Sequence, residues 1–191
     1  MALDLVIRGG TIATAEKVFR ADVGVEGEKV VQIGTGLAGR RVISAENMLV
    51  LPGGVDSHCH IEQLSGMGVM AADDFYSATV SAAYGGTTTV IPFCAQHRGD
   101  DLKKVLADYH ERARAKAVID YGFHLIIANP DEKTLTRDLP DAIGSGIRSF
   151  KIFMTYDRMR LHDEQILDVM AAGSSSASTL SVGSPMIRWK P

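Results

Sequence analysis

The stretch PGGVDSHCH, residues 52–60, decides how the rest of the chain is interpreted. Side chains alternate between the two faces of a β-strand, so His58 and His60 point the same way and are placed to bind one metal ion through their imidazoles. Asp56 has the same parity and is placed to orient a histidine. The alternative is a pair of surface histidines near a strand end. The Pro-Gly-Gly lead-in, the apolar strand and the elements that follow favour the metal-binding interpretation.

Residues 3–51, which precede this stretch, show apolar positions with period two, interrupted by glycine, asparagine and aspartate. This pattern predicts short strands joined by tight turns, without a helix of useful length. We therefore expect a small β unit before Pro52.

After Pro52, apolar strands alternate with amphipathic helices. The expected strands lie at residues 54–58, 87–93, 119–128 and 147–154. The expected helices lie at 73–84, from a cap at Asp100 through Ala113, at 131–143 and at 162–172. Four strand–helix units in succession predict an α/β fold with parallel strands and right-handed helical crossovers.

A second chemical signal is SFKIFMTY, residues 149–156, which places Lys151 in an otherwise apolar strand. Burying an ammonium group without a partner is costly, and burial lowers the pKa of a lysine. The neutral amine can then add carbon dioxide and become a carbamate, an anionic ligand able to bridge two metal ions. The alternative is an edge lysine whose amine reaches solvent.

Together these motifs resemble the cyclic amidohydrolases, and within them the dihydropyrimidinase and hydantoinase group. The resemblance extends from Leu3 to about Gly173 and also rests on GGTTTVIPF at 85–93 and IDYGFHLIIA at 119–128. It implies a metal-bearing (β/α)₈ TIM barrel attached to a small β-sandwich. Residues 1–52 are then expected to be the N-terminal part of the sandwich, and residues 53–173 the first half of the barrel.

The resemblance also implies roles for single residues. His58 and His60 become ligands of one metal ion, and Lys151, as a carboxylated lysine, bridges it to a second. Two divalent ions, usually zinc, lower the pKa of a bridging water and polarise the amide, while Tyr156 hydrogen-bonds the substrate oxygen as it becomes an oxyanion. The family's remaining ligands and its catalytic aspartate are expected to be absent from this chain, because no histidine follows His162.

The residues after His60 bear on the substrate. Dihydroorotase-like proteins carry an arginine two positions later, and allantoinase-like proteins carry Asn-Glu-Pro, whereas this chain has Ile-Glu-Gln at 61–63. Together with Tyr156, this difference favours an uncharged cyclic ureide or imide over dihydroorotate. The expected reaction is hydrolysis of a non-peptide C–N bond, which opens a dihydropyrimidine or hydantoin ring to an N-carbamoyl amino acid.

Residues 174–191 break the pattern, since six of them are serine and none is acidic. We expect a non-native or disordered tail there, the alternative being an ordinary flexible end. Residues 53–173 provide about 30 residues for each of four βα units, against ~250 for a whole barrel. We therefore expect a truncated, association-prone half-barrel without full hydrolase activity on its own.

Two further interpretations stay open. One is a non-catalytic, dihydropyrimidinase-like scaffold comparable to the collapsin response mediator proteins. The other is one half of a split amidohydrolase whose second half is a separate chain. His58, His60 and Lys151 together argue against the scaffold, which has no need to bury a lysine.

The composition excludes several other classes of protein. The chain has 191 residues, 46% of them hydrophobic, and a formal net charge of −3, which gives no electrostatic case for a nucleic-acid partner. No apolar run approaches a membrane span, and no signal peptide is recognisable, so we expect a cytoplasmic protein. Cys59 and Cys94 are too few for a disulfide framework. The expected partner is a small-molecule substrate, and the group it resembles generally forms homo-oligomers.

Overall fold

The computed structural model describes residues 3–65, 68–174 and 179–183 of the chain. The chain divides into two compact units, residues 1–53 and 54–191, which are described separately below.

The first unit is a five-stranded sheet. Its strands are β1 (Leu3–Ala13), β2 (Val18–Glu26), β3 (Lys29–Gly34), β4 (Gly39–Ser44) and β5 (Leu49–Val50). Strand β1 is central: it pairs antiparallel with β2 and parallel with β4 and β5, while β3 pairs antiparallel with β2. This confirms a small β unit without a helix among its described residues. A β-sandwich also needs a second sheet packed on this one, so the predicted β-sandwich stays a prediction.

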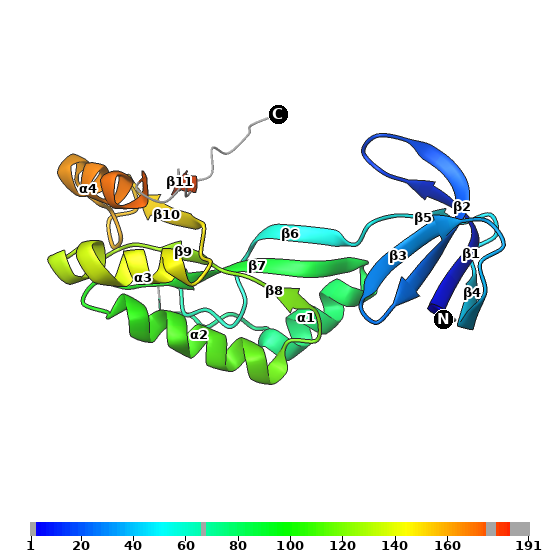
Figure 1. The fold of residues 1–191 in the computed structure, drawn as a ribbon. Coiled ribbons are helices and arrows are strands. Elements are labelled where there is room, and N and C mark those ends of the chain that lie inside the picture. The colour runs from blue at the N-terminus through cyan, green and yellow to red at the C-terminus, as the bar shows by residue number, and fades with distance from the viewer. Residues whose placement is uncertain (1–2, 66–67, 175–178, 184–191) are drawn as a thin grey trace, which may run out of the picture. The chain divides into compact units, whose positions relative to one another are not determined.

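The second unit is a parallel α/β unit (Figure 1). Its elements in chain order are β6 (Gly54–Cys59), α1 (Phe75–Tyr84), β7 (Thr87–Ala95), α2 (Leu102–Lys116), β8 (Asp120–Tyr121), β9 (His124–Ile126), the π-helix η1 (Thr134–Asp138), α3 (Leu139–Gly144), β10 (Ser149–Phe153), α4 (Asp163–Ser174) and β11 (Thr179–Gly183). The strand order is β11-β10-β9-β7-β6, and each neighbouring pair is parallel. The predicted succession of parallel strands and helices is therefore confirmed.

Several element boundaries differ from the predicted ones. Asp101, not Asp100, caps α2 by accepting the backbone N–H of Lys104, and the Asp100 carboxylate instead accepts the N–H of His97. The predicted strand at 119–128 is split into β8 and β9 at Gly122 and Phe123. The predicted helix at 131–143 is a π-helical turn followed by α3, whose first turn contains a proline, where the missing N–H costs no helical hydrogen bond.

The predicted tail lies largely outside the described residues. Ser174 ends α4, and residues 179–183 form β11, a strand that the sequence pattern did not predict. Within the described residues, no helix is both long and apolar enough to cross a lipid bilayer.

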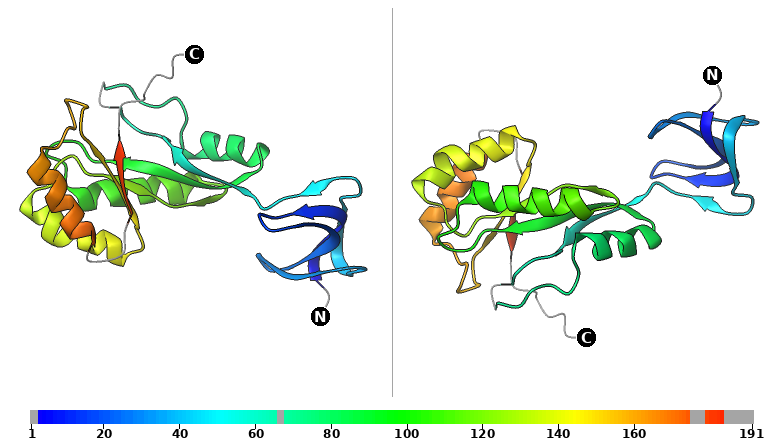
Figure 2. Two further views of the ribbon diagram at one scale, coloured as in Figure 1. Left: turned by 90° about the horizontal axis from the view of Figure 1, so that it is seen from above. Right: turned by 90° about the horizontal axis from the view of Figure 1, so that it is seen from below.

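The main core lies between one face of the parallel sheet and its helices. Leu125 and Phe150 point from neighbouring strands toward buried side chains such as Phe75, Tyr109 and Leu139 on the helices. Seen from below, helix α2 lies over the strands (Figure 2). The opposite face of the sheet carries a smaller cluster of buried residues: Phe93, Ala95, Ile126, Ala128 and Met159. The candidate site residues His58, His60 and Lys151 contact Phe93 of this second cluster.

We predict that Leu125→Ala lowers the free energy of unfolding by about 2–5 kcal/mol, because it leaves a cavity among fully buried side chains. The matched control is Leu167→Ala on α4, where the leucine is 64% exposed and the change should stay within about 0.5 kcal/mol. Urea unfolding of the 191-residue chain followed by circular dichroism measures both. Equal effects of the two substitutions would contradict the core described here.

Candidate functional site

The ring of Phe93, on β7, is the point around which His58, His60 and Lys151 gather. The centroid of the Phe93 ring lies 4.8 Å from that of His58 and 5.1 Å from that of His60. The two histidine rings are 5.8 Å apart, and the amine nitrogen of Lys151 lies 4.3 Å from the centroid of the Phe93 ring. The structure thus brings His58 and His60 close to Lys151. The sequence predicted that the two histidines lie on the same side of their strand, and the structure agrees.

The register of the parallel sheet explains why these side chains meet. Lys151 on β10 is paired with Ile126 on β9, which is paired with Ala95 on β7, two residues beyond Phe93. Paired residues in neighbouring strands share a face, so Lys151 projects on the same side as Phe93. His58 and His60 reach that side from the carboxyl end of β6.

The environment of His58 keeps its imidazole neutral. Partial burial lowers the pKa of this ring, and the positive charges of Lys151, His60 and His124 lower it further, against a smaller opposing effect of Asp56. A neutral imidazole has a free nitrogen lone pair, which is the form that binds a metal ion.

His60 has a defined tautomer because of Gln63. The side-chain oxygen of Gln63 lies 2.6 Å from Nδ1 of His60. That oxygen only accepts hydrogen bonds, so Nδ1 carries a proton, and the nitrogen available to a metal ion is Nε2. Gln63 is thus a candidate site residue to which the sequence pattern assigned no role in orienting His60. Its one sequence signal was its position three residues after His60.

Glu62 anchors the segment that carries His60 and Gln63. It has a positive φ of 47°, and its carboxylate accepts hydrogen bonds from the backbone N–H of Phe75 at 3.1 Å and from Lys116 Nζ at 2.8 Å. The Glu62 backbone oxygen also accepts from Arg112 at 2.5 Å. The turn after β6 is therefore attached to the start of α1 and the end of α2.

Lys151 is 9% exposed and contacts aromatic ring faces. Its amine nitrogen lies 5.2 Å from the centroid of Phe153 as well as close to Phe93. Among the described residues, no carboxylate forms an ion pair with it, and burial lowers its pKa. This confirms that the strand buries the lysine, which favours the neutral amine.

Asp56 and Cys59 lie outside the cluster. The Asp56 carboxylate accepts the backbone N–H of His58 at 3.0 Å and so contacts the peptide group of that residue, not its imidazole. Cys59 packs against the main core on the other face, as its parity predicts, and burial raises the pKa of its thiol to about 11. Cys59 is therefore a packing residue.

Tyr156 borders a hollow of about 490 Å³ that His60 also lines. Its ring is 37% exposed and lies 5.5 Å from the ring of Phe153. The other lining residues are Gln63, Ser65, Val69, Met70, Ala71, Ile126, Phe153 and Met159. The hollow is largely apolar, and none of its described lining residues is a lysine, an arginine or a carboxylate.

The donor set of the cluster fits part of a metal site. Two imidazoles and an amine that can become a carbamate are ligands suited to zinc and similar divalent ions. Within the described ranges, no three His, Cys, Asp or Glu side chains come together as a metal-binding group. A complete site would therefore need the modified Lys151 or ligands from elsewhere.

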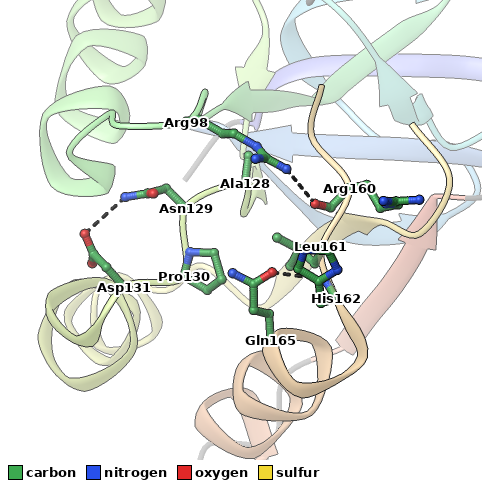
Figure 3. A pocket seen from close by; sticks show the side chains of 9 residues that line it. All are labelled: Arg98, Ala128, Asn129, Pro130, Asp131, Arg160, Leu161, His162 and Gln165. Atoms are coloured by element: carbon green, nitrogen blue, oxygen red, sulfur yellow. Dashed lines mark hydrogen bonds between the residues drawn. The ribbon is translucent and has the colours of Figure 1, made fainter. Parts of the chain in front are cut away.

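A second, smaller hollow of about 200 Å³ lies beyond the carboxyl ends of β7, β9 and β10 (Figure 3). Its lining residues are Arg98, Ala128, Asn129, Pro130, Asp131, Arg160, Leu161, His162 and Gln165. Arg98 donates a hydrogen bond to the backbone oxygen of Arg160, and the Asn129 amide donates to Asp131. These groups are engaged with one another, and none of the predicted site residues lines this hollow.

Comparison with known proteins identifies relatives over most of the chain. It is 42% identical over 168 residues to a D-hydantoinase of Ralstonia pickettii, which covers 86% of this chain and 36% of the relative. It is 34% identical over 176 residues to a dihydropyrimidinase of Rattus norvegicus, covering 85% of this chain and 33% of the relative. No family model matches the chain.

A solved D-hydantoinase structure superposes with a TM-score of 0.89 at 39% identity, over 94% of this chain and 39% of that one. The chain thus spans about a third of the length of the curated relatives it matches. These findings confirm the resemblance to the amino-terminal portion of this group.

We predict that Lys151→Met raises the pKa of His58. The substitution removes a positive charge that disfavours protonation of the ring, while burial, the larger cause of the lowered pKa, remains. The value should therefore move toward that of an ordinary histidine without reaching it. Nuclear magnetic resonance titration of the ring protons measures the change.

His110 provides the internal control. Its pKa is lowered by burial and by Arg114, so it should not change in the Lys151→Met variant. An unchanged His58 pKa, or an equal shift at His110, would contradict the geometry of the cluster.

Proposed function

We propose that this chain, a homologue of the amino-terminal portion of D-hydantoinases and dihydropyrimidinases, supplies part of the active site of a metal-dependent hydrolase that opens cyclic amides. The gathering of His58, His60 and Lys151 around Phe93 carries this proposal. His58 and His60 lie at the carboxyl end of the parallel strand β6, the end at which barrel enzymes place their chemistry. The names of the relatives support the class of reaction.

In this proposal, His58, His60 and a carboxylated Lys151 are the residues of this chain that would hold divalent metal ions. When bound, the ions supply an activated water and polarise the amide carbonyl. Lys151 is prepared for carboxylation by its burial. The neutral amine would form an N–C bond to carbon dioxide and release a proton to solvent, which leaves a carbamate whose single negative charge is shared by two oxygens.

Tyr156 is the proposed donor to the substrate. Its phenol borders the same hollow as His60, so a ring bound there would lie next to both. As water adds to the amide carbon, negative charge develops on the carbonyl oxygen, and a hydrogen bond from a fixed phenol stabilises that charge.

The lining of the hollow supports an uncharged ring as substrate. Ile126, Phe153 and Met159 offer apolar contact, and Gln63 is a neutral polar neighbour. A substrate with a carboxylate, such as dihydroorotate, would need a cation, and none is among the described lining residues. A dihydropyrimidine or hydantoin, opened to an N-carbamoyl amino acid, is therefore the proposed substrate class.

The second candidate function is that of a non-catalytic scaffold. A split enzyme, in which another chain supplies the rest of the active site, is a variant of the hydrolase proposed above. The burial of Lys151 beside two histidines favours the catalytic candidate, because an apolar side chain would stabilise this face of the sheet without the cost of desolvating an amine.

We expect the 191-residue chain to bind Zn²⁺ in bicarbonate buffer, as measured by isothermal titration calorimetry. His58→Ala, His60→Ala and Lys151→Ala should each weaken binding by roughly 10-fold or more. His162→Ala, which removes an exposed histidine outside the cluster, is the matched control and should leave binding unchanged. Absence of Zn²⁺ binding by the unaltered chain would favour the scaffold.

We further expect ring opening of dihydrouracil or hydantoin when the chain is co-expressed with the part of the Ralstonia pickettii D-hydantoinase that it does not match. Tyr156→Phe should lower kcat of this assembly by about 10²–10³-fold and leave its metal content unchanged, because the lost hydrogen bond forms in the transition state. Tyr84→Phe, at a tyrosine that is 92% exposed, is the control. A Tyr156→Phe assembly as active as the unaltered one would remove Tyr156 from the proposed mechanism.

A further inference from the structure

His124, the first residue of β9, contacts both strands that carry the cluster. Its Nε2 lies 3.0 Å from the backbone oxygen of Ser57, the residue before His58 on β6. Its Nδ1 forms a hydrogen bond with the hydroxyl of Ser149, two residues before Lys151 on β10. The sequence analysis gave His124 no role in the site.

The partners define the protonation of the ring. A backbone carbonyl only accepts hydrogen bonds, so Nε2 of His124 carries a proton and donates it to Ser57. In the neutral ring, Nδ1 then accepts from the Ser149 hydroxyl. Both polar edges of this imidazole are therefore engaged in joining β6 to β10, and its face lies 5.0 Å from the centroid of Phe93.

Strands β6 and β10 are not neighbours, because β7 and β9 lie between them (Figure 1). Backbone pairing also leaves the end of β6 weakly defined, since the register with β7 shifts between Asp56 and Cys59. Cys59 is opposite Pro92, which has no N–H to donate. The hydrogen bond from His124 thus holds the backbone carbonyl of Ser57 at the point where the pairing of β6 with β7 is irregular.

We infer that His124 is a positioning residue that sets the distance between the His58–His60 pair and Lys151. This inference rests on the proposed function, because the distance matters when these groups share metal ions. Loss of the ring would free the end of β6 from β10, while loss of the Ser149 hydroxyl alone would remove one of the two bonds.

The first test measures Zn²⁺ affinity of the full chain in bicarbonate buffer by competition with a chromophoric chelator. His124→Ala should weaken binding roughly 10-fold, the scale for a residue that orients a metal ligand. Ser149→Ala should have a smaller effect, and Ser149→Thr, which keeps the hydroxyl, should restore the unaltered affinity. The double variant should bind no more weakly than His124→Ala, since both changes interrupt one link.

His110→Ala is the matched control. This histidine packs its ring 4.9 Å from Phe123, among the residues of the main core, and should leave Zn²⁺ affinity unchanged. A His124→Ala variant that binds Zn²⁺ like the unaltered chain, while His60→Ala does not, would overturn the inference and leave the proposed function standing.

The second test needs no metal. In the metal-free chain, the backbone amides of residues 57–60 should exchange their hydrogens at least about tenfold faster in the His124→Ala variant than in the His110→Ala variant. If the unaltered chain binds no Zn²⁺ but this acceleration occurs, the proposed function fails and the link between the strands is confirmed. Unchanged exchange at residues 57–60 would overturn the inference whatever the chain binds.

Discussion

Contact of polar groups with one buried aromatic ring is the constraint on which the site depends. Phe93 is 2% exposed, and four polar side chains lie around its ring. Three are the imidazoles of His58, His60 and His124, and the fourth is the Lys151 amine. The Lys151 ammonium is attracted to the negative face of the ring, which partly offsets its loss of water. The apolar ring thus gathers groups that would otherwise repel one another when protonated.

Much of this arrangement is predictable from periodicity. The two-residue spacing of His58 and His60 places them on one side of a strand, and the surrounding apolar residues place Lys151 in a buried one. Alternation of strands and helices gives a parallel sheet with its core on the helical face. These are local rules, because each depends on neighbours within one element or on the order of elements along the chain.

The parts that were not predicted depend on contacts between distant residues. His124 has no partner at ligand spacing in the sequence, and its two hydrogen-bond partners lie 67 and 25 residues away. Gln63 orients His60 only because the turn after β6 folds back, and Glu62 holds that turn through a lysine 54 residues further on. The choice of Asp101 over Asp100 as helix cap also depended on a competing local bond, since Asp100 is engaged with His97.

The proposed chemistry places two demands on the cluster, and one physical cause meets both. A metal ion needs an imidazole without a second proton, and carbon dioxide needs an amine without its third proton. Desolvation lowers the pKa of His58 and of Lys151, and the charge of Lys151 lowers that of His58 further. Carboxylation of Lys151 would then turn a positive neighbour into a negative one. Lys151, whose charge adds to desolvation in disfavouring protonation of His58, would become an anion that balances the charge of the metal ions. This order makes lysine, rather than arginine or glutamate, the residue that suits this position, because only its amine can be neutral first and anionic later.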